Sequence, residues 1–424
     1  MMEYKKTTLN NQLRVITVPK PGSPTTTVLV LVEAGSAFES KNINGLSHFL
    51  EHMVFKGTEK RPRSIDIASE LDGLGASYNA FTSVDYTGYY AKAENRHFDQ
   101  ILDVVADIYL HSTFDQNEIG KERGVIVEEI NMYEDLPMRN VGDLFTSLMY
   151  GDQPAGWNVA GEKEIIKKLT RDDFLKYHRE RYLAGSTIVI VAGDVDDQEA
   201  VKKVEQAFSA IPAGKGGARE KTTEKQSAPQ LLLKNKKSDQ THLVLGVRAF
   251  DAFDERRFAL QILSDILGGS MSSRLFQKVR EEMGAAYYVR AGADLYSDHG
   301  YLAVSAGIDN GRIIEVTQAI LEVIKGIKEK PVGAKELELA KEHTIGGMMM
   351  EIETSDQIAN FYGGMEVVTG KTMTVEEIEK RIRAVTADDV LKLAQEIFRD
   401  DRLNLAVITP FDNQEKLQNA LTLH

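Results

Sequence analysis

Two histidines and a glutamate lie close together in the segment Gly45–Phe55. In a helix, residues three and four positions apart share a face, so His48, Glu51 and His52 would point in one direction. The rest of the segment is mostly apolar, and imidazoles and a carboxylate are costly to bury there without partners. A divalent metal ion would satisfy the imidazoles, and metal-bound water would give the carboxylate a proton to accept. The spacing therefore predicts a metal site with hydrolytic chemistry.

The order of these residues, H-x-x-E-H, is the motif of the inverzincin metallopeptidases. A match to so short a pattern is a hypothesis, because the pattern also arises by chance. The alternative is a helix whose two histidines are hydrogen-bonded core residues, and the motif alone leaves that alternative open.

A catalytic zinc site needs a third protein ligand and leaves a fourth position for water. The best candidate segment is Asp115–Asn131, which is typical of a helix with an acidic first turn. Glu118, Glu122 and Glu129 fall near one stripe of that helix, whereas Glu128 lies about 100° around the axis. From spacing alone, such a stripe is more often a solvated helix face than a set of ligands.

Five segments of the chain resemble the pitrilysin/insulinase family of zinc metallopeptidases. The closer likeness is to its short members, the mitochondrial processing peptidase type and their bacterial homologues. The segments are GLSHFLEHMVFKGT at 45–58, GASYNAFTSVDYT at 75–87, KERGVIVEEI at 121–130, YGDQPAGW at 150–157 and SRLFQKVREEMGAAYYV at 273–289. They span both halves of the chain, so the resemblance covers nearly all of it.

The resemblance implies one Zn²⁺ ion per chain, held by His48, His52 and Glu129. It makes Glu51 the general base, which takes a proton from water and passes it to the departing amine. Glu122 matches a second acidic position that supports the site. Glu128 matches no ligand and is expected to face outward.

The resemblance also implies a strand that receives the substrate. The matching strand in the family is an exposed edge onto which a peptide adds as an extra strand. Asn79 would contribute a side-chain contact, with Ala80 and Phe81 beside it. From the pattern alone, an ordinary strand explains the segment Ser77–Val84 equally well.

A second pair of implied catalytic residues, Arg280 and Tyr287, lies in the later half of the chain. In the family this pair faces the zinc site, where the tyrosine can donate to the oxyanion and the arginine can hold a substrate carbonyl. The long members of the family carry both elements on one polypeptide of twice this length. We therefore expect a homodimer in which the C-terminal domain of one chain completes the zinc site of the other. Without the family, an ordinary surface arginine and a half-buried tyrosine would be preferred.

The chain of 424 residues is too long for one ordinary core, and it reads as two copies of one plan. A helix and strand beginning at Thr170 recur, with the same spacing between them, from Thr386 onward. We predict an α+β fold of two homologous domains, each an antiparallel-rich sheet with helices packed on one face. The expected parts are a zinc-bearing domain at 1–212, a glycine-rich linker at 213–229, and a homologous domain without a metal site at 230–424.

Composition excludes some function classes. The net charge of −13 argues against nucleic acid as a partner, and the absence of cysteine excludes disulfides and thiol catalysis. No apolar run is long enough for a membrane span, and the first residues show no signal or transit pattern, so we expect a cytoplasmic protein.

The resemblance points to a zinc endopeptidase that cleaves unstructured peptides or presequence-like segments inside a closed chamber. The mitochondrial enzymes read a substrate arginine with two acidic residues, and the matching positions here hold Arg139 and Asp143. One acid is replaced by a base, so we expect broader cleavage. The alternatives are a non-catalytic or regulatory subunit of the same fold, and the catalytic half of an obligate heterodimer.

Overall fold

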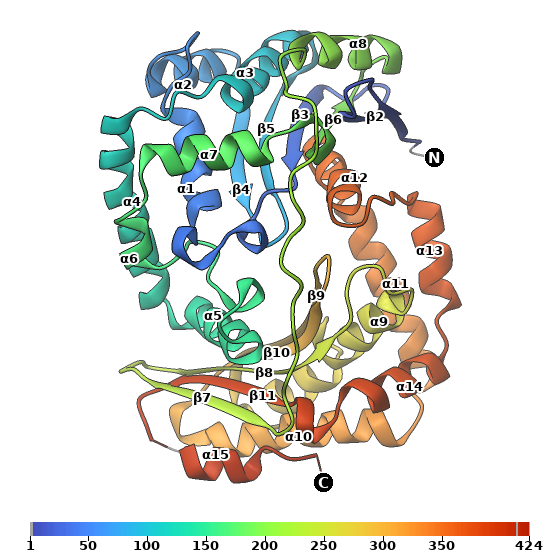
Figure 1. Ribbon diagram of the computed structural model, residues 1–424. Helices are drawn as coiled ribbons and strands as arrows, with labels where there is room; N and C mark the ends of the chain where they lie inside the picture. The colour runs from blue at the N-terminus through green and yellow to red at the C-terminus, as the bar shows by residue number, and fades with distance from the viewer. Residues whose placement is uncertain (1–2, 413, 424) are drawn as a thin grey trace. The chain divides into compact units, whose positions relative to one another are not determined.

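A computed structural model describes residues 3–412 and 414–423 of the chain (Figure 1). The chain forms two compact units, and each is made of separate stretches of sequence. The first unit comprises the residues up to Ile130, Trp157–Glu220 and Met349–Val375, and the second comprises Asn131–Gly156, Lys221–Met348 and the residues from Glu376 onward.

The first unit is built on a six-stranded sheet in the order β1-β2-β6-β3-β5-β4. All neighbouring strands are antiparallel except β2 and β6, which run parallel. The strands are β1 (Lys5–Thr8), β2 (Arg14–Pro19), β3 (Thr25–Val32), β4 (Ser77–Thr82), β5 (Thr87–Glu94) and β6 (Thr187–Gly193). Strand β4 therefore lies at one edge of the sheet.

Helices cover the face of this sheet onto which Val28 and Val30 project, and these valines join one large core with the apolar residues of α1 and α3. The helices of this unit are α1 (Leu46–Met53), α2 (Ser64–Gly73), α3 (Phe98–His111), α4 (Gln116–Asp135), α6 (Lys163–Ile166), α7 (Arg171–Arg181), α8 (Asp197–Ala207) and α12 (Ser355–Thr369). The layer of helices expected on one face is present. Helix α12 is an addition on the opposite face.

Helix α12 comes from the later half of the chain and packs on β3 and β6 (Figure 1). A Cβ atom at Gly363 would lie only 2.9 Å from Leu31 Cδ1 and 3.0 Å from Ile190 Cδ1, so glycine permits this close approach. The carboxylate of Glu366 is buried under the helix, 2.6 Å from Lys6 Nζ and 3.2 Å from Arg14 Nη1. A carboxylate buried in this way needs charged partners, and Lys6 on β1 and Arg14 on β2 supply them.

The second unit repeats the plan with a five-stranded sheet in the order β7-β11-β8-β10-β9. Its strands are β7 (Gln230–Asn235), β8 (Thr241–Ala249), β9 (Ala286–Leu295), β10 (Gly300–Ile308) and β11 (Asn404–Thr409). Its helices are α5 (Pro137–Tyr150), α9 (Arg257–Gly268), α10 (Ile313–Glu329), α11 (Ala334–Met350), α13 (Val375–Ala384), α14 (Ala387–Ile397) and α15 (Gln414–Ala420). The α+β fold class with two sheets is confirmed.

The predicted repeat is visible in matching elements. The offset in residue number between the starts of β2 and β7 equals the offset between the starts of α7 and α14. Helices α5 and α12 are also counterparts, because that offset carries the bounds of α5 close to those of α12. The division of the chain at 213–229 into homologous halves stays a prediction. The compact units differ from those halves because α5 buries Val141 and Phe145 against β8 and β11, while α12 packs on β3 and β6.

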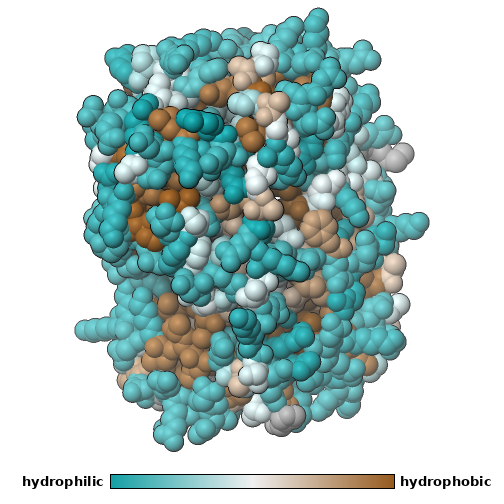
Figure 2. Space-filling view, in the orientation of Figure 1, coloured by the Kyte–Doolittle hydropathy of each residue, from teal (hydrophilic) through white to brown (hydrophobic). Residues whose placement is uncertain are grey.

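Within the described residues, no helix is both long enough and apolar enough to cross a bilayer. Much of the face visible in Figure 2 is hydrophilic, with smaller apolar areas between the polar side chains. This distribution agrees with a composition in which 27% of residues are charged.

Candidate metal centre

Helix α1 presents the motif residues because of how it begins and what it buries. It starts after Gly45, whose φ of 92° is left-handed and whose Cβ position would lie 2.7 Å from Ala160 O. Its apolar side chains enter the core, namely Leu46, Phe49, Leu50 and Met53. His48, Glu51 and His52 are left on the remaining face, as the helical spacing predicts.

A buried carboxylate holds the first turn of α1. Glu39 Oε2 accepts a hydrogen bond from the backbone N–H of Gly45 at 2.7 Å, and Oε1 accepts from that of Ser47 at 2.6 Å. A negative charge at a helix N-terminus is stabilised by the unpaired N–H groups and the helix dipole. Burial raises the pKa of Glu39 despite these bonds. Glu39 thus positions the helix that carries the histidines.

The structure brings His48 and His52 on α1 together with Glu129 on α4. Glu129 Oε2 lies 3.6 Å from His48 Nε2 and 3.5 Å from His52 Nε2, and one ligand atom from each residue lies within 4.8 Å of the others. Ligand atoms about 2.1 Å from a tetrahedral zinc ion would be about 3.4 Å apart. The spacing and the two-nitrogen, one-carboxylate donor set therefore fit zinc, and Glu129 is the glutamate of the predicted stripe that meets both histidines.

Glu122 supports the cluster from behind. Its Oε1 lies 2.9 Å from His52 Nδ1, and its Oε2 lies 2.6 Å from the ammonium group of Lys56. Burial alone would raise the pKa of Glu122, but the hydrogen bonds with His52 and Lys56 keep it below its ordinary value. A metal-binding histidine commonly donates its other ring N–H to a carboxylate, which orients the ring. Glu122 is in place for that role, with Lys56 as its anchor.

We expect replacement of Lys56 by methionine to weaken zinc binding by up to about 10-fold, less than the roughly 10- to 100-fold usual when a group in direct contact with a ligand is lost. The reason is that Glu122 would lose its anchor and hold the His52 ring less firmly. Competition with a chromophoric chelator measures the affinity. Lys121→Met is the matched control, because Lys121 pairs with Glu118 on the exposed face of α4, the helix that carries Glu122. Equal affinity in the two variants would contradict the assignment.

The remaining two glutamates of the predicted α4 helix point elsewhere. Glu118 Oε1 pairs with Lys121 at 2.6 Å, and Glu128 is exposed, as predicted. The stripe read from spacing therefore divides into two residues that meet α1 and one that is solvated.

Glu51 is the third polar residue on the partly buried motif face of α1, and it contacts the sheet. Its Oε2 accepts a hydrogen bond from the hydroxyl of Thr82 at 2.6 Å. Burial raises the pKa of Glu51, and the charge of Glu129 adds to this, although the Thr82 hydroxyl and His52 act in the opposite direction. A carboxylate with a raised pKa beside a candidate metal site suits a general base working near neutral pH.

The predicted substrate residues Asn79, Ala80 and Phe81 lie on β4, the edge strand of the first sheet. Asn79 Oδ1 accepts a hydrogen bond from the N–H of Ala80 at 2.9 Å. Among the described strands, β4 pairs only with β5, so its other edge keeps backbone groups available to a further strand.

Arg280 and Tyr287 lie together in the second unit. Arg280 occupies a π-helical turn, Phe276–Glu282, and its Nη1 donates to the carbonyl oxygen of Tyr287 at 2.6 Å. The Tyr287 residue is 71% exposed, more than the half-burial expected of an ordinary tyrosine at this position. Single-turn π-helices are frequent at functional sites.

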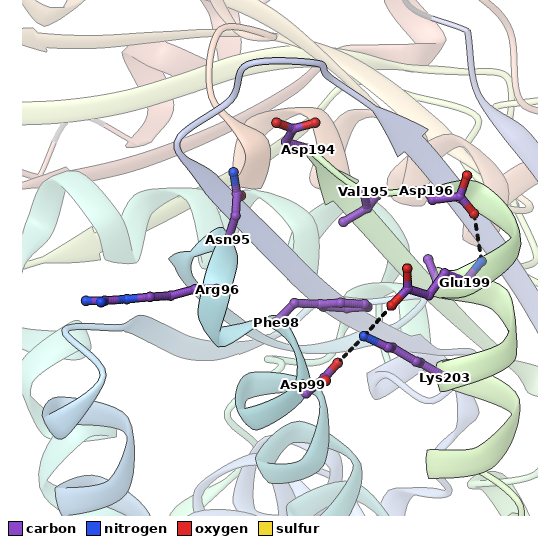
Figure 3. Close-up of a pocket in the computed structure, with 10 residues that line it drawn as sticks. Asn95, Arg96, Phe98, Asp99, Asp194, Val195, Asp196, Glu199 and Lys203 are labelled. Carbon is purple, nitrogen blue, oxygen red and sulfur yellow. Dashed lines mark hydrogen bonds and ion pairs between the residues drawn. The ribbon is translucent and has the colours of Figure 1, made fainter.

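A small pocket of about 200 Å³ lies near the starts of α3 and α8 (Figure 3). Lys203 Nζ contacts Asp99 at 2.6 Å and Glu199 at 2.7 Å, and Asp196 accepts from the backbone N–H of Glu199. These charged side chains are engaged with one another, and the lining contains none of the predicted site residues.

Three residues of this site were not predicted from the sequence: Glu39, Lys56 and Thr82. Each is distant along the chain from the residue it supports or lies outside the helical repeat of α1. The only signal was their presence in or near the segments that resemble the family.

Two models of known protein families match successive parts of the chain. The family model described as "Insulinase (Peptidase family M16)" matches residues 14–163, and that described as "Peptidase M16 inactive domain" matches residues 168–343. The second match covers most of the half that lacks the histidine pair.

Relatives that this chain matches over nearly their whole length occur in several bacteria. The "Uncharacterized zinc protease YmxG" of Bacillus subtilis is 37% identical over 410 residues, which is 96% of this chain and 99% of that protein. The "Uncharacterized zinc protease ML0855" of Mycobacterium leprae is 35% identical over 421 residues, 99% of this chain and 94% of that protein. A protease from Helicobacter pylori of known crystal structure is 23% identical, covers 96% of this chain and 100% of its own, and has a TM-score of 0.89. At that identity the likeness shows a shared fold.

Proposed function

Since the chain belongs to the insulinase family of peptidases (peptidase family M16), we propose that it is a zinc-dependent endopeptidase that hydrolyses unstructured peptides. The observation that carries the proposal is the meeting of His48, His52 and Glu129, with Glu51 on the same face of α1. Relatives that align over nearly their whole length are named zinc proteases, which supports it. A structural subunit would have no need of a general base beside a complete ligand set.

The proposed mechanism follows from the roles of the side chains. Zinc, when bound, supplies a Lewis acid that activates water and polarises the scissile carbonyl. His48, His52 and Glu129 would hold it, and Glu122 keeps the His52 ring in position. Glu51 accepts the proton of the attacking water and delivers it to the departing amine nitrogen. One water and one peptide bond thus become a carboxylate and an amine, with no covalent enzyme intermediate.

Strand β4 is proposed to bind the substrate main chain. A peptide that pairs with a free sheet edge is held by backbone hydrogen bonds, which tolerate many side chains. In this arrangement the bound peptide would lie alongside Asn79, Ala80 and Phe81 of β4. Because Arg139 replaces one of the expected acidic residues, a positional-scanning peptide library should show no strong selection for arginine two residues before the cut.

The direct test is hydrolysis of a quenched, unstructured basic peptide. The zinc-loaded protein should cleave it, a chelator should stop cleavage, and added Zn²⁺ should restore it, because the base has no activated water to act on without the metal. One zinc per chain should be found by metal analysis. If the zinc-loaded protein, alone and at high concentration, does not hydrolyse the peptide, the chain is better explained as a non-catalytic subunit or as half of an obligate heterodimer. Light scattering on the purified chain separates these two explanations.

We further propose a homodimer in which Arg280 and Tyr287 of one chain serve the zinc site of the other. The proposal is supported by the presence of both elements on one chain, in different compact units. Mixing an inactive Glu51→Gln chain with an inactive Arg280→Ala chain should then restore up to about one quarter of wild-type activity, because random pairing leaves one intact site in half of the dimers. No restoration after confirmed subunit exchange would contradict sharing across the dimer.

A further inference from the structure

Glu51 has one hydrogen-bond donor among the described residues, the hydroxyl of Thr82. Thr82 is the last residue of β4, so it lies on the edge strand proposed to receive the substrate. The bond joins Thr82 Oγ1 to Glu51 Oε2 at 2.6 Å. This hydrogen bond therefore links the base on α1 directly to the edge strand of the sheet.

The backbone around Thr82 is well fixed. Thr82 is opposite Thr87 in the β4–β5 pair, and the hydroxyl of Thr87 donates to Ala34 O at 2.6 Å. The following turn is closed by a hydrogen bond from Ser83 N–H to Tyr86 O at 2.8 Å. A Cβ atom on Gly35 would lie 2.4 Å from Ser83 O, so the neighbouring loop packs directly on the turn. A hydroxyl on so constrained a strand end can hold a side chain in one orientation.

A carboxylate that acts as a base must present one oxygen to the attacking water in a fixed direction. The Thr82 hydroxyl occupies Oε2, which leaves Oε1 for the water proton. Because Glu51 has three rotatable side-chain bonds, an unheld carboxylate would visit several rotamers. A donor on the substrate strand selects one of them.

We propose that Thr82 is a positioning residue that couples the substrate-binding strand to the general base. This inference rests on the proposed peptidase function and deepens it. A peptide main chain that pairs with β4 is brought to the same strand whose end orients Glu51, so substrate register and base direction are set by one element. Thr82 itself transfers no proton.

Thr82→Val keeps the side-chain volume and removes the hydroxyl. We expect kcat to fall about 10- to 100-fold, in line with the loss of a hydrogen bond to a charged group, with KM unchanged. Thr82→Ser retains the hydroxyl and should keep kcat within a few-fold of wild type. Thr8→Val, an exposed change on the opposite edge strand of the same sheet, is the control for removal of a threonine hydroxyl.

Three readouts are independent of turnover. Zinc affinity should be equal in wild type and Thr82→Val, and peptide affinity should be equal in Glu51→Gln and the Glu51→Gln/Thr82→Val double variant. A crystal structure of Thr82→Val should show the Glu51 carboxylate rotated from its wild-type position. If the valine variant does not fold, Thr82→Ala replaces it in every comparison.

The outcomes separate the inference from the proposed function. If the wild-type protein does not hydrolyse the peptide, the proposed peptidase function is refuted, and the behaviour of the Thr82 variants does not change that conclusion. Suppose that wild type is active, Glu51→Gln is inactive and Thr82→Val has the wild-type kcat. This result would overturn the role of Thr82 and leave the proposed peptidase function standing. A rise in KM with unchanged kcat would also overturn that role, because it would make Thr82 a binding contact.

Discussion

Replacing Glu51 with glutamine is expected to abolish peptide hydrolysis while leaving zinc binding intact. Glutamine has the shape of glutamate, and its amide oxygen can still accept the hydrogen bond from Thr82. It cannot take up a proton from water, and a general base contributes about 10²- to 10⁴-fold to the rate. We therefore expect kcat to fall by that factor, measured with the quenched peptide at saturating substrate.

The control for this prediction makes the same chemical change elsewhere. Glu128→Gln alters an exposed glutamate on α4, one residue from the proposed ligand Glu129, and should leave kcat and zinc content unchanged. A Glu51→Gln enzyme that turns over at the wild-type rate would remove Glu51 from the mechanism. Loss of zinc from that variant would mean that Glu51 belongs to the ligand set.

Replacing Arg61 with methionine is expected to destabilise the first unit by about 3–5 kcal/mol, as for other buried charges that lose their partner. Arg61 is 4% exposed and binds three carboxylates, each at 2.7 Å: Glu70, Asp103 and Asp107. Asp107 is itself only 6% exposed, so the variant leaves a buried negative charge facing an apolar side chain. Urea unfolding followed by circular dichroism measures the change.

Arg63→Met is the matched control, because Arg63 is 73% exposed and pairs with Asp66 on the surface. An exposed pair contributes little to stability, so the unfolding midpoint of Arg63→Met should hardly move. A similar loss in both variants would show that the buried position of Arg61 is unimportant.

The effect of Arg61 should also depend on pH. Burial would raise the pKa of Asp103, but hydrogen bonds from Arg61 and Lys60 lower it below its ordinary value. A carboxyl whose pKa is depressed by folding stabilises the protein above its unfolded pKa of about 3.9 and loses that contribution as the pH falls. The stability difference between wild type and Arg61→Met should therefore shrink on acidification below about pH 4.

Local periodicity was enough to predict the helix that carries the histidine pair. The 3.6-residue repeat sets the direction of each side chain around one helix, so His48, Glu51 and His52 were expected on one face before any neighbour was known. Matching patterns in the two halves of the chain likewise predicted the internal repeat and the two-sheet α+β plan. Periodicity left Glu118, Glu122 and Glu129 as equal members of one stripe, because spacing says nothing about what the stripe faces.

Tertiary structure decided which neighbours these helices meet. Contact with α1 selects Glu129 and Glu122, while Glu118 pairs with Lys121 in solvent. It also brings Glu39 to the start of α1 and Thr82 to Glu51, and it places α12 on the sheet of the first unit. These contacts join residues far apart in sequence or outside any helical repeat. They depend on how whole elements pack, and no local pattern of residue types encodes that packing.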